Sequence, residues 1–199
     1  GIEVLQSEVL DIDTTRRTVK TTDTELAFDR LVIALGAELA PDALPGFAQA
    51  AHNLYTLDGA VAAGAALRRV DEGRVAVIVS RLPYKCPAAP YEAAFLADAL
   101  LRRRGVRERT AVDVYTPEPY PMPTAGPVLG NALAAMLAER GIALHAGITL
   151  ERIDPGAREL VVAGGARVGY DVLLGVPAHR APEVLHRSGI AAEPGFLPV

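Results

Sequence analysis

Residues 74–92 restrict the fold of this chain more than any other segment. Positions 75–79 are a short run of β-branched and small apolar residues, which predicts a strand buried on both faces. After Pro90, apolar residues recur at helical spacing as far as the cationic residues 102–104, and Gly105 follows. The segment is therefore predicted to be a strand, a loop and a helix, which is the unit of a parallel α/β sheet.

The loop between this strand and this helix has an unusual composition. In a dinucleotide-binding fold it would be a glycine-rich turn whose backbone N–H groups hold a diphosphate. Here it contains no glycine, and Pro83, Pro87 and Pro90 each lack an N–H. The loop contains instead the only cysteine of the chain, Cys86, beside Lys85. We therefore expect weak binding of NAD(H) or none, and the alternative is a nucleotide domain with an unusual loop.

The rest of the chain predicts an α/β fold with alternating helices and strands. Helices are predicted at 58–70, 90–104, 128–140 and 181–187, and strands at 74–79, 111–115, 142–145 and 170–176. This alternation predicts a parallel sheet with helices on both faces. Short strands at 149–153, 158–163 and 166–169 predict a β-meander beside it. The proline-rich residues 116–123 predict a loop.

The first quarter of the chain is predicted to be β-rich. Residues 1–28 alternate in short runs and predict an antiparallel meander. The apolar run 31–35 predicts a buried strand that ends at Gly36, and residues 36–54 predict a connecting loop.

Composition excludes several classes of function. The net charge of −4 and the lack of basic clusters beyond residues 102–104 argue against a nucleic-acid partner. No apolar run approaches the roughly 18–20 residues that a membrane span requires. One cysteine excludes an internal disulfide framework, and His52, His145 and His186 lack the spacing of a metal site, so no metal is expected. The sequence begins Gly-Ile-Glu-Val, without a signal peptide or an initiator Met, so we expect an internal piece of a cytoplasmic protein.

Two stretches of the chain have the same pattern. Residues 28–34 (Phe-Asp-Arg-Leu-Val-Ile-Ala) and 168–174 (Val-Gly-Tyr-Asp-Val-Leu-Leu) each end a meander with an aromatic residue, an Asp and an apolar strand. The doubled pattern resembles the pyridine nucleotide-disulfide oxidoreductase superfamily, flavoproteins with two dinucleotide-binding domains. In that superfamily a meander and a strand with an Ala-Thr-Gly-like turn close the flavin domain, and residues 31–37 (Leu-Val-Ile-Ala-Leu-Gly-Ala) resemble this element.

Further segments narrow the resemblance to one branch. Residues 86–92 (Cys-Pro-Ala-Ala-Pro-Tyr-Glu) resemble the redox-cysteine segment of the sulfide:quinone oxidoreductase and flavocytochrome c sulfide dehydrogenase branch. Residues 176–182 and 195–199 resemble the return of that branch to its flavin domain. The resemblance implies part of a flavin domain at 1–55, a Rossmann-like NAD(P)-binding-like domain at 56–175 and the return crossover at 176–199.

The resemblance also implies a chemistry and a site. In the full-length protein Cys86 would capture sulfide as a persulfide and pass two electrons to FAD, and a quinone or a cytochrome would accept them. Lys85 and Glu92 would assist Cys86, while Gly36, Ala37, Pro177 and His179 would contact the flavin. The chain alone is not expected to hold FAD tightly or to turn over. A peripheral membrane location and a homodimer stay open.

Other interpretations of the same residues remain. Leu197 stands where flavocytochrome c sulfide dehydrogenases have a second cysteine, so their disulfide cannot be carried over, and a partner beyond Val199 stays open. Cys86 could instead be a buried structural cysteine. Glu92 could simply complement the start of its helix, Gly36 could be a plain strand-end glycine, and His179 with its neighbour Arg180 could be a solvent-exposed pair. Whole-chain alternatives are an NADH dehydrogenase-like flavoprotein and a non-catalytic module that binds a partner through the proline-rich loop.

Overall fold

The computed structural model describes residues 1–191 and residue 196. Leu197 and most of the segment 195–199 therefore lie outside the described residues. The chain forms two compact units, one of residues 39–179 and one of residues 1–38 together with residues from 180 onward.

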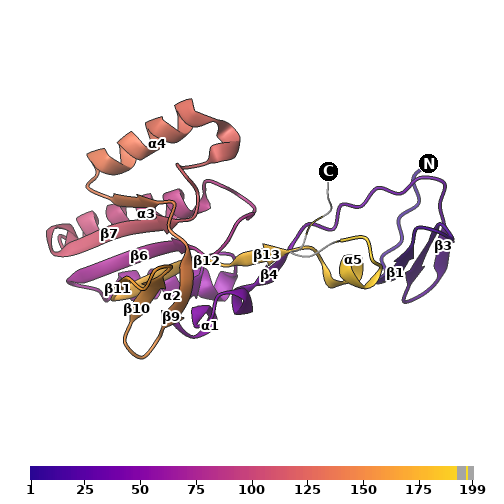
Figure 1. The fold of residues 1–199 in the computed structure, drawn as a ribbon, viewed down its shortest axis with the longest axis horizontal. Coiled ribbons are helices and arrows are strands. Elements are labelled where there is room, and N and C mark those ends of the chain that lie inside the picture. The colour runs from indigo at the N-terminus through magenta and orange to yellow at the C-terminus, as the bar shows by residue number, and fades with distance from the viewer. Residues whose placement is uncertain (192–195, 197–199) are drawn as a thin grey trace. The chain divides into compact units, whose positions relative to one another are not determined.

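The larger unit is built on a five-stranded parallel sheet (Figure 1). In spatial order its strands are β5 (His52–Asn53), β12 (Val172–Val176), β6 (Gly73–Val79), β7 (Thr110–Thr116) and β8 (Ala143–Ala146). Val77 in the middle of β6 pairs with Leu174 on one side and with Val114 on the other. The apolar run that predicted a strand buried on both faces is thus the centre of the sheet.

The three long helices lie on one face of this sheet (Figure 1). They are α2 (Leu57–Leu67), α3 (Ala89–Arg103) and α4 (Pro127–Glu139). Their buried residues, among them Leu67, Leu101 and Leu137, form one core with Val75 and Val77 of β6. Short 3-10 turns connect the elements at Arg107–Arg109 and Pro123–Ala125.

The opposite face is covered differently from the prediction. An antiparallel meander of β9 (Leu150–Asp154), β10 (Glu159–Val162) and β11 (Arg167–Gly169) lies there, with the single turn α1 (Phe47–Ala50). Ile153, Leu160 and Phe47 pack with Ile78 of β6. The three-layer α/β prediction is confirmed, but helices on both faces were wrong, because the apolar face of the meander already covers the second face.

The smaller unit contains the predicted N-terminal meander. Its strands β1 (Val9–Asp13), β2 (Thr18–Thr21) and β3 (Glu25–Ala27) pair in sequence order, and α5 (Glu183–Arg187) packs on β1. Ile12 is buried there against Ala181, Val184 and Leu185.

Two predictions about the first quarter of the chain were wrong. Residues 31–35 form no strand, and Val32 is 89% exposed. An apolar run forms a strand only where a neighbouring strand can pair with it. No strand among the described residues pairs with residues 31–35. The expected connecting loop at 36–54 instead contains β4 (Glu38–Ala40), a 3-10 turn (Pro41–Ala43), α1 and β5, and β4 pairs with β13 (Ala178–Arg180).

Candidate functional site

Four neighbouring strands bring polar residues together at the carboxyl edge of the parallel sheet. Tyr55 follows β5, His179 follows β12, the loop 80–88 follows β6, and Glu118 follows β7. These strands are adjacent in the order β5-β12-β6-β7, so the segments that follow them meet at one edge. Ligands of open α/β sheets bind at this edge.

The thiol of Cys86 is exposed at this edge. Its backbone has a φ of 56°, in the left-handed region, and its carbonyl accepts a hydrogen bond of 3.0 Å from the N–H of Ala89 at the start of α3. A buried structural cysteine was therefore the wrong alternative. Lys85 is the exposed neighbour of Cys86 in the sequence, and Glu92 is exposed in the first turn of α3, which begins three residues after Cys86.

The start of α3 has no free backbone donor among its first four residues. The N–H of Ala89 is bonded to the Cys86 carbonyl, and those of Tyr91 and Glu92 are bonded to the Ala88 carbonyl. Pro90 has none. A phosphate at a helix start needs such groups free.

Tyr55, which the sequence analysis missed, joins the loop to His179. Its hydroxyl donates to the carbonyl of Lys85 and lies 3.4 Å from the carbonyl of Cys86. Its ring meets the ring of His179 edge-on, with centroids 4.9 Å apart, and Lys85 Nζ lies 5.9 Å from the Tyr55 centroid. Burial, and next the nearby Cys86, raise the pKa of Tyr55 to about 12, so its hydroxyl remains a donor at neutral pH.

His179 is buried with one ring nitrogen free. Nδ1 lies 3.0 Å from the carbonyl of Pro177, so Nδ1 bears the proton, and Nε2 is buried without a partner among the described residues. Burial lowers the pKa of His179, the bond to Pro177 opposes this, and the charge of Lys85 lowers it further. His179 is therefore a neutral imidazole whose Nε2 is available to accept a hydrogen bond. The alternative of a solvent-exposed His179–Arg180 pair was wrong for His179, which is only 7% exposed.

Glu118 is a buried carboxylate that three hydroxyl groups reach. Its Oε2 accepts hydrogen bonds from Tyr84 at 3.0 Å, from Thr116 at 3.1 Å and from Tyr91. Burial and the proximity of Glu118 raise the pKa of Tyr84, and burial and the bond to Glu118 raise that of Tyr91. From the sequence, the proline-rich segment around Glu118 was predicted to be a loop, with binding of a partner as an alternative, and Glu118 itself was not identified. The one available signal was an acidic residue between two prolines directly after a strand.

A small, mostly apolar cavity lies between the Cys86 loop and the proline-rich loop. Its volume is about 180 Å³. Its lining residues come from both loops and from the first turn after Met122: Leu82, Pro83, Tyr84, Pro87, Glu118, Pro123 and Thr124.

The residues predicted to contact a cofactor lie in different parts of the chain. Pro177 and His179 are buried beside the carboxyl edge of the sheet. Gly36 and Ala37 belong to the smaller unit and directly precede β4. Gly36 has a φ of 71° with open space around it, so the left-handed turn explains the glycine there.

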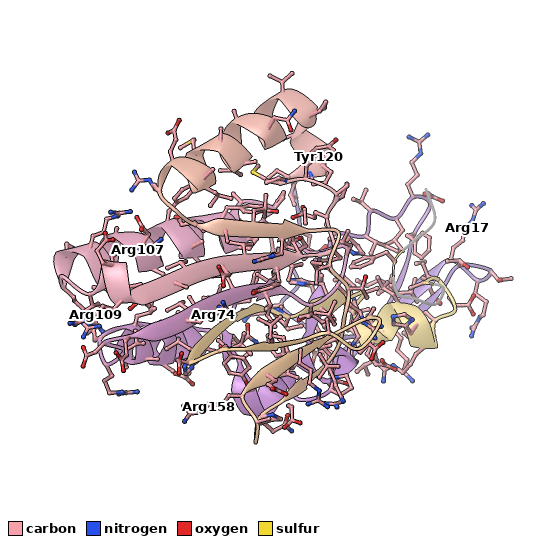
Figure 2. The ribbon with its side chains drawn as sticks, turned by 60° about the vertical axis from the view of Figure 1, so that its left-hand side comes forward. Arg17, Arg74, Arg107, Arg109, Tyr120 and Arg158 are labelled. Carbon is pink, nitrogen blue, oxygen red and sulfur yellow. The ribbon has the colours of Figure 1, made fainter. Side chains whose placement is uncertain are left out.

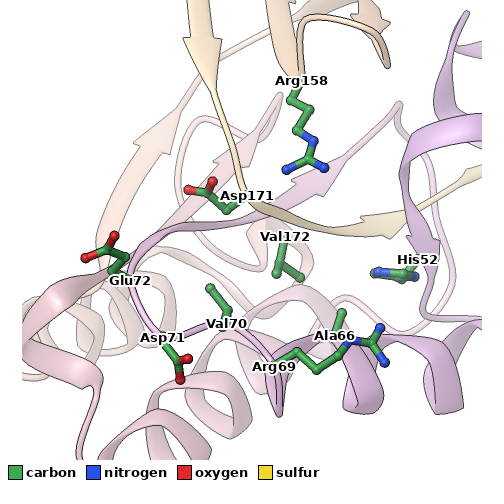
Figure 3. Close-up of a pocket in the computed structure, with 9 residues that line it drawn as sticks. All are labelled: His52, Ala66, Arg69, Val70, Asp71, Glu72, Arg158, Asp171 and Val172. Carbon is green, nitrogen blue, oxygen red and sulfur yellow. The ribbon is translucent and has the colours of Figure 1, made fainter.

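A second hollow lies at the amino edge, where β6 and β12 begin (Figure 3). Its volume is about 560 Å³. Arg69, Arg158 and His52 line it together with acidic side chains, and burial and the nearby Arg69 lower the pKa of His52. Arg107 and Arg109 precede β7 at the same edge (Figure 2). None of the predicted site residues lies there.

Comparison with known proteins gives a family match over most of the chain. The family model described as pyridine nucleotide-disulphide oxidoreductase matches residues 1–195. The mitochondrial sulfide:quinone oxidoreductase of Mus musculus is 24% identical over 216 aligned positions, which cover 100% of this chain and 46% of the mouse protein. That of Dictyostelium discoideum is 26% identical over 84% of this chain and 38% of its own length.

A solved structure has the same fold. The sulfide:quinone oxidoreductase from the hyperthermophilic bacterium Aquifex aeolicus superposes with a TM-score of 0.76 at 23% identity, over 96% of this chain and 46% of that one. This chain thus spans less than half the length of the curated relatives it matches. No helix in the described part of the chain is long and apolar enough to cross a bilayer.

Proposed function

Because this chain belongs to the pyridine nucleotide-disulphide oxidoreductase family, we propose that it is part of a FAD-dependent enzyme in which Cys86 captures a sulfide-like substrate and FAD is the oxidant. The observation behind the proposal is the exposed thiol of Cys86, placed in a left-handed turn at the carboxyl edge of the parallel sheet. The names of the mouse and Dictyostelium relatives support the same substrate class. In domain terms, the smaller unit would belong to the flavin domain and the larger unit, residues 39–179, to the second domain, so the boundaries would lie at residues 38 and 180 and not at the predicted 55 and 176.

The reaction that we propose forms one sulfur–sulfur bond. The thiolate of Cys86 and a hydrosulfide ion join as a persulfide, and the two electrons released leave with FAD as their acceptor. Lys85, the neighbour of Cys86 in the sequence, would favour the approach of the two anions through its positive charge, and Glu92 in the first turn of α3 would accept a proton.

One feature of the described residues, the free acceptor of His179, suits a bound flavin. The buried Nε2 of His179 is a hydrogen-bond acceptor without a partner in the described part of the chain, and a bound group with a donor would satisfy it. His179 and Pro177 of the larger unit would contact FAD, and contact by Gly36 and Ala37 stays a prediction of the resemblance. When bound, FAD supplies the two-electron acceptor that the single cysteine of this chain cannot provide.

The test of this function uses the flavin-loaded, full-length protein. Cys86→Ser should abolish flavin reduction by sulfide, followed as the loss of flavin absorbance. Reduction of the same variant by dithionite, which needs no thiol, should be unchanged and serves as the control. Sulfide-dependent rates equal to those of the unmodified protein would exclude the proposal.

The electron acceptor is proposed to be a quinone at a membrane surface. The names of the mouse, Dictyostelium and Aquifex relatives, all sulfide:quinone oxidoreductases, support a quinone over a cytochrome. Oxidation of the sulfide-reduced protein by a short-chain quinone, but not by cytochrome c, is the expected result. The reverse preference would favour the cytochrome.

We also propose that NAD(H) is not a substrate. The loop after β6 has three prolines and no glycine, and the start of α3 has no free N–H among its first four residues. Both features disfavour a diphosphate and therefore disfavour an NADH dehydrogenase-like protein.

A further inference from the structure

The left-handed backbone of Cys86 needs support from its surroundings. Residues other than glycine adopt this conformation at a cost, and they keep it where neighbouring groups hold the backbone. Two tyrosine hydroxyls tie the residues just before Cys86 to groups outside the loop. Tyr55 bonds the carbonyl of Lys85, and Tyr84, two residues before Cys86, bonds Glu118.

Glu118 is itself firmly anchored to the sheet. Its backbone N–H lies 3.2 Å from the hydroxyl oxygen of Thr116, the last residue of β7, and its carbonyl accepts a bond of 2.8 Å from the N–H of Gly147. Its side chain is 2% exposed and accepts from Thr116 and from Tyr91 of α3. One carboxylate oxygen therefore joins the Cys86 loop, β7 and α3.

The contact between Tyr84 and Glu118 has a competitor inside the loop. The Tyr84 hydroxyl also lies 3.2 Å from the carbonyl of Pro87, but it has only one hydrogen to donate. When Glu118 accepts that hydrogen, the loop is fixed to the sheet. When Tyr84 donates to Pro87 instead, the loop is bonded only to itself on this side.

We propose that Glu118 is a positioning residue for Cys86, which acts through Tyr84 to hold the loop in the conformation that presents the thiol. This inference rests on the proposed function. Glu118 also has no cationic partner among the described residues, and a buried carboxylate without one costs stability. Glu118 costs folding stability and contacts Tyr84 in the Cys86 loop, and both properties fit a role in positioning Cys86.

The test separates the loop contact from the other contacts of Glu118. Tyr84→Phe and Glu118→Gln, each in the flavin-loaded full-length protein, should slow sulfide-dependent flavin reduction by at least about tenfold, because small displacements of a reacting atom reduce rates strongly. They should also shift the pH profile of Cys86 alkylation by iodoacetamide. The double variant should be no slower than the slower single variant, because Glu118→Gln weakens the same bond that Tyr84→Phe removes.

Tyr91→Phe is the matched control. It removes a hydroxyl from the same Glu118 oxygen, but Tyr91 belongs to α3 and not to the loop. It should lower the thermal midpoint while leaving the rate and the alkylation profile unchanged within about twofold, since the Tyr84 contact remains.

Three results would overturn the positioning role. The first is a normal rate and alkylation profile in both Tyr84→Phe and Glu118→Gln while Cys86→Ser is inactive, which leaves the proposed function intact. The second is an equal slowing by Tyr91→Phe, which would assign the effect to general destabilisation. The third is a double variant whose losses multiply. If Cys86→Ser keeps full activity, the proposed function fails, and the alkylation profiles still decide whether Glu118 positions the thiol.

Discussion

Among single residues, Cys86 combines an exposed thiol with a backbone conformation that suits glycine. Its φ of 56° predicts that Cys86→Gly is more stable than Cys86→Ala by about 1 kcal/mol, because only glycine adopts the left-handed region freely. Urea unfolding of the two variants measures the difference. Ala88→Gly is the control, since Ala88 has right-handed backbone angles of −79° and −22° and should lose stability on the same change. Equal stability of the two Cys86 variants would show that the turn relaxes in solution.

His179 should make the stability of the protein depend on pH. Burial, the largest effect, lowers its pKa below the ordinary value of 6.5, so the unfolded chain binds a proton more readily than the folded one. Stability should therefore fall as the pH drops from 6.5 toward the lower folded pKa, and it should be unaffected by this group above 6.5. His179→Gln should flatten that part of the profile of urea midpoint against pH. His52 also has a lowered pKa, so His52→Gln serves as the parallel control, and an unchanged slope in His179→Gln would contradict the assignment.

Among the elements, the ends of α3 and α4 are held together by one carboxylate. Asp98 of α3 is fully buried and accepts hydrogen bonds from Arg102 at 3.0 Å and from Arg107 at 2.6 Å. Both arginines also donate to the carbonyl of Arg140 at the end of α4. Burial alone would raise the pKa of Asp98, but the bonds from the two arginines lower it below its ordinary value of 3.8.

Asp98→Ala should destabilise the protein by about 3–5 kcal/mol, the usual effect of removing one partner of a buried ion pair. Urea unfolding measures the loss. Because the folded pKa is lowered, the contribution of Asp98 is complete above pH 3.8 and should disappear as the pH falls through the folded value. Arg102→Gln is the milder comparison, since Arg102 is half exposed and Arg107 remains bonded. A loss below about 1 kcal/mol in Asp98→Ala would mean that water replaces the carboxylate as the partner of the two arginines.

Elements with a strong local pattern could be predicted from the sequence, and those that depend on distant partners could not. The run at 75–79, with a helical pattern after it, identified β6 and α3 because their periodicity and boundary residues are local. The run at 31–35 had an equally good strand composition, but a strand also needs a neighbour. Tyr55 and Glu118 could not be predicted for the same reason. Their hydrogen-bond partners, Lys85 and Tyr84, lie 30 and 34 residues away along the chain.

For the whole molecule, the arrangement at the carboxyl edge of the sheet decides which ligands the larger unit can accept. Four strands end there, and the segments that follow them supply a thiol, a bare imidazole nitrogen and a buried carboxylate. In dinucleotide-binding relatives of this fold the same edge offers free amide donors to a diphosphate. Here the N–H groups at the start of α3 are already bonded within the turn. The chain therefore has the fold of these relatives without free amide donors for a diphosphate at that turn.

This difference predicts that the chain does not bind NADH with submicromolar affinity. Without free N–H groups at the start of α3, the two phosphates would lose water without gaining hydrogen bonds there. Titration calorimetry with NADH and with NADPH measures the affinity directly. Restoring a donor with Pro90→Ala, at the second position of α3, tests the cause: binding should strengthen in that variant if the missing amide is responsible. Submicromolar binding by the unmodified chain would show that a diphosphate is held elsewhere, and it would favour the NADH dehydrogenase-like alternative.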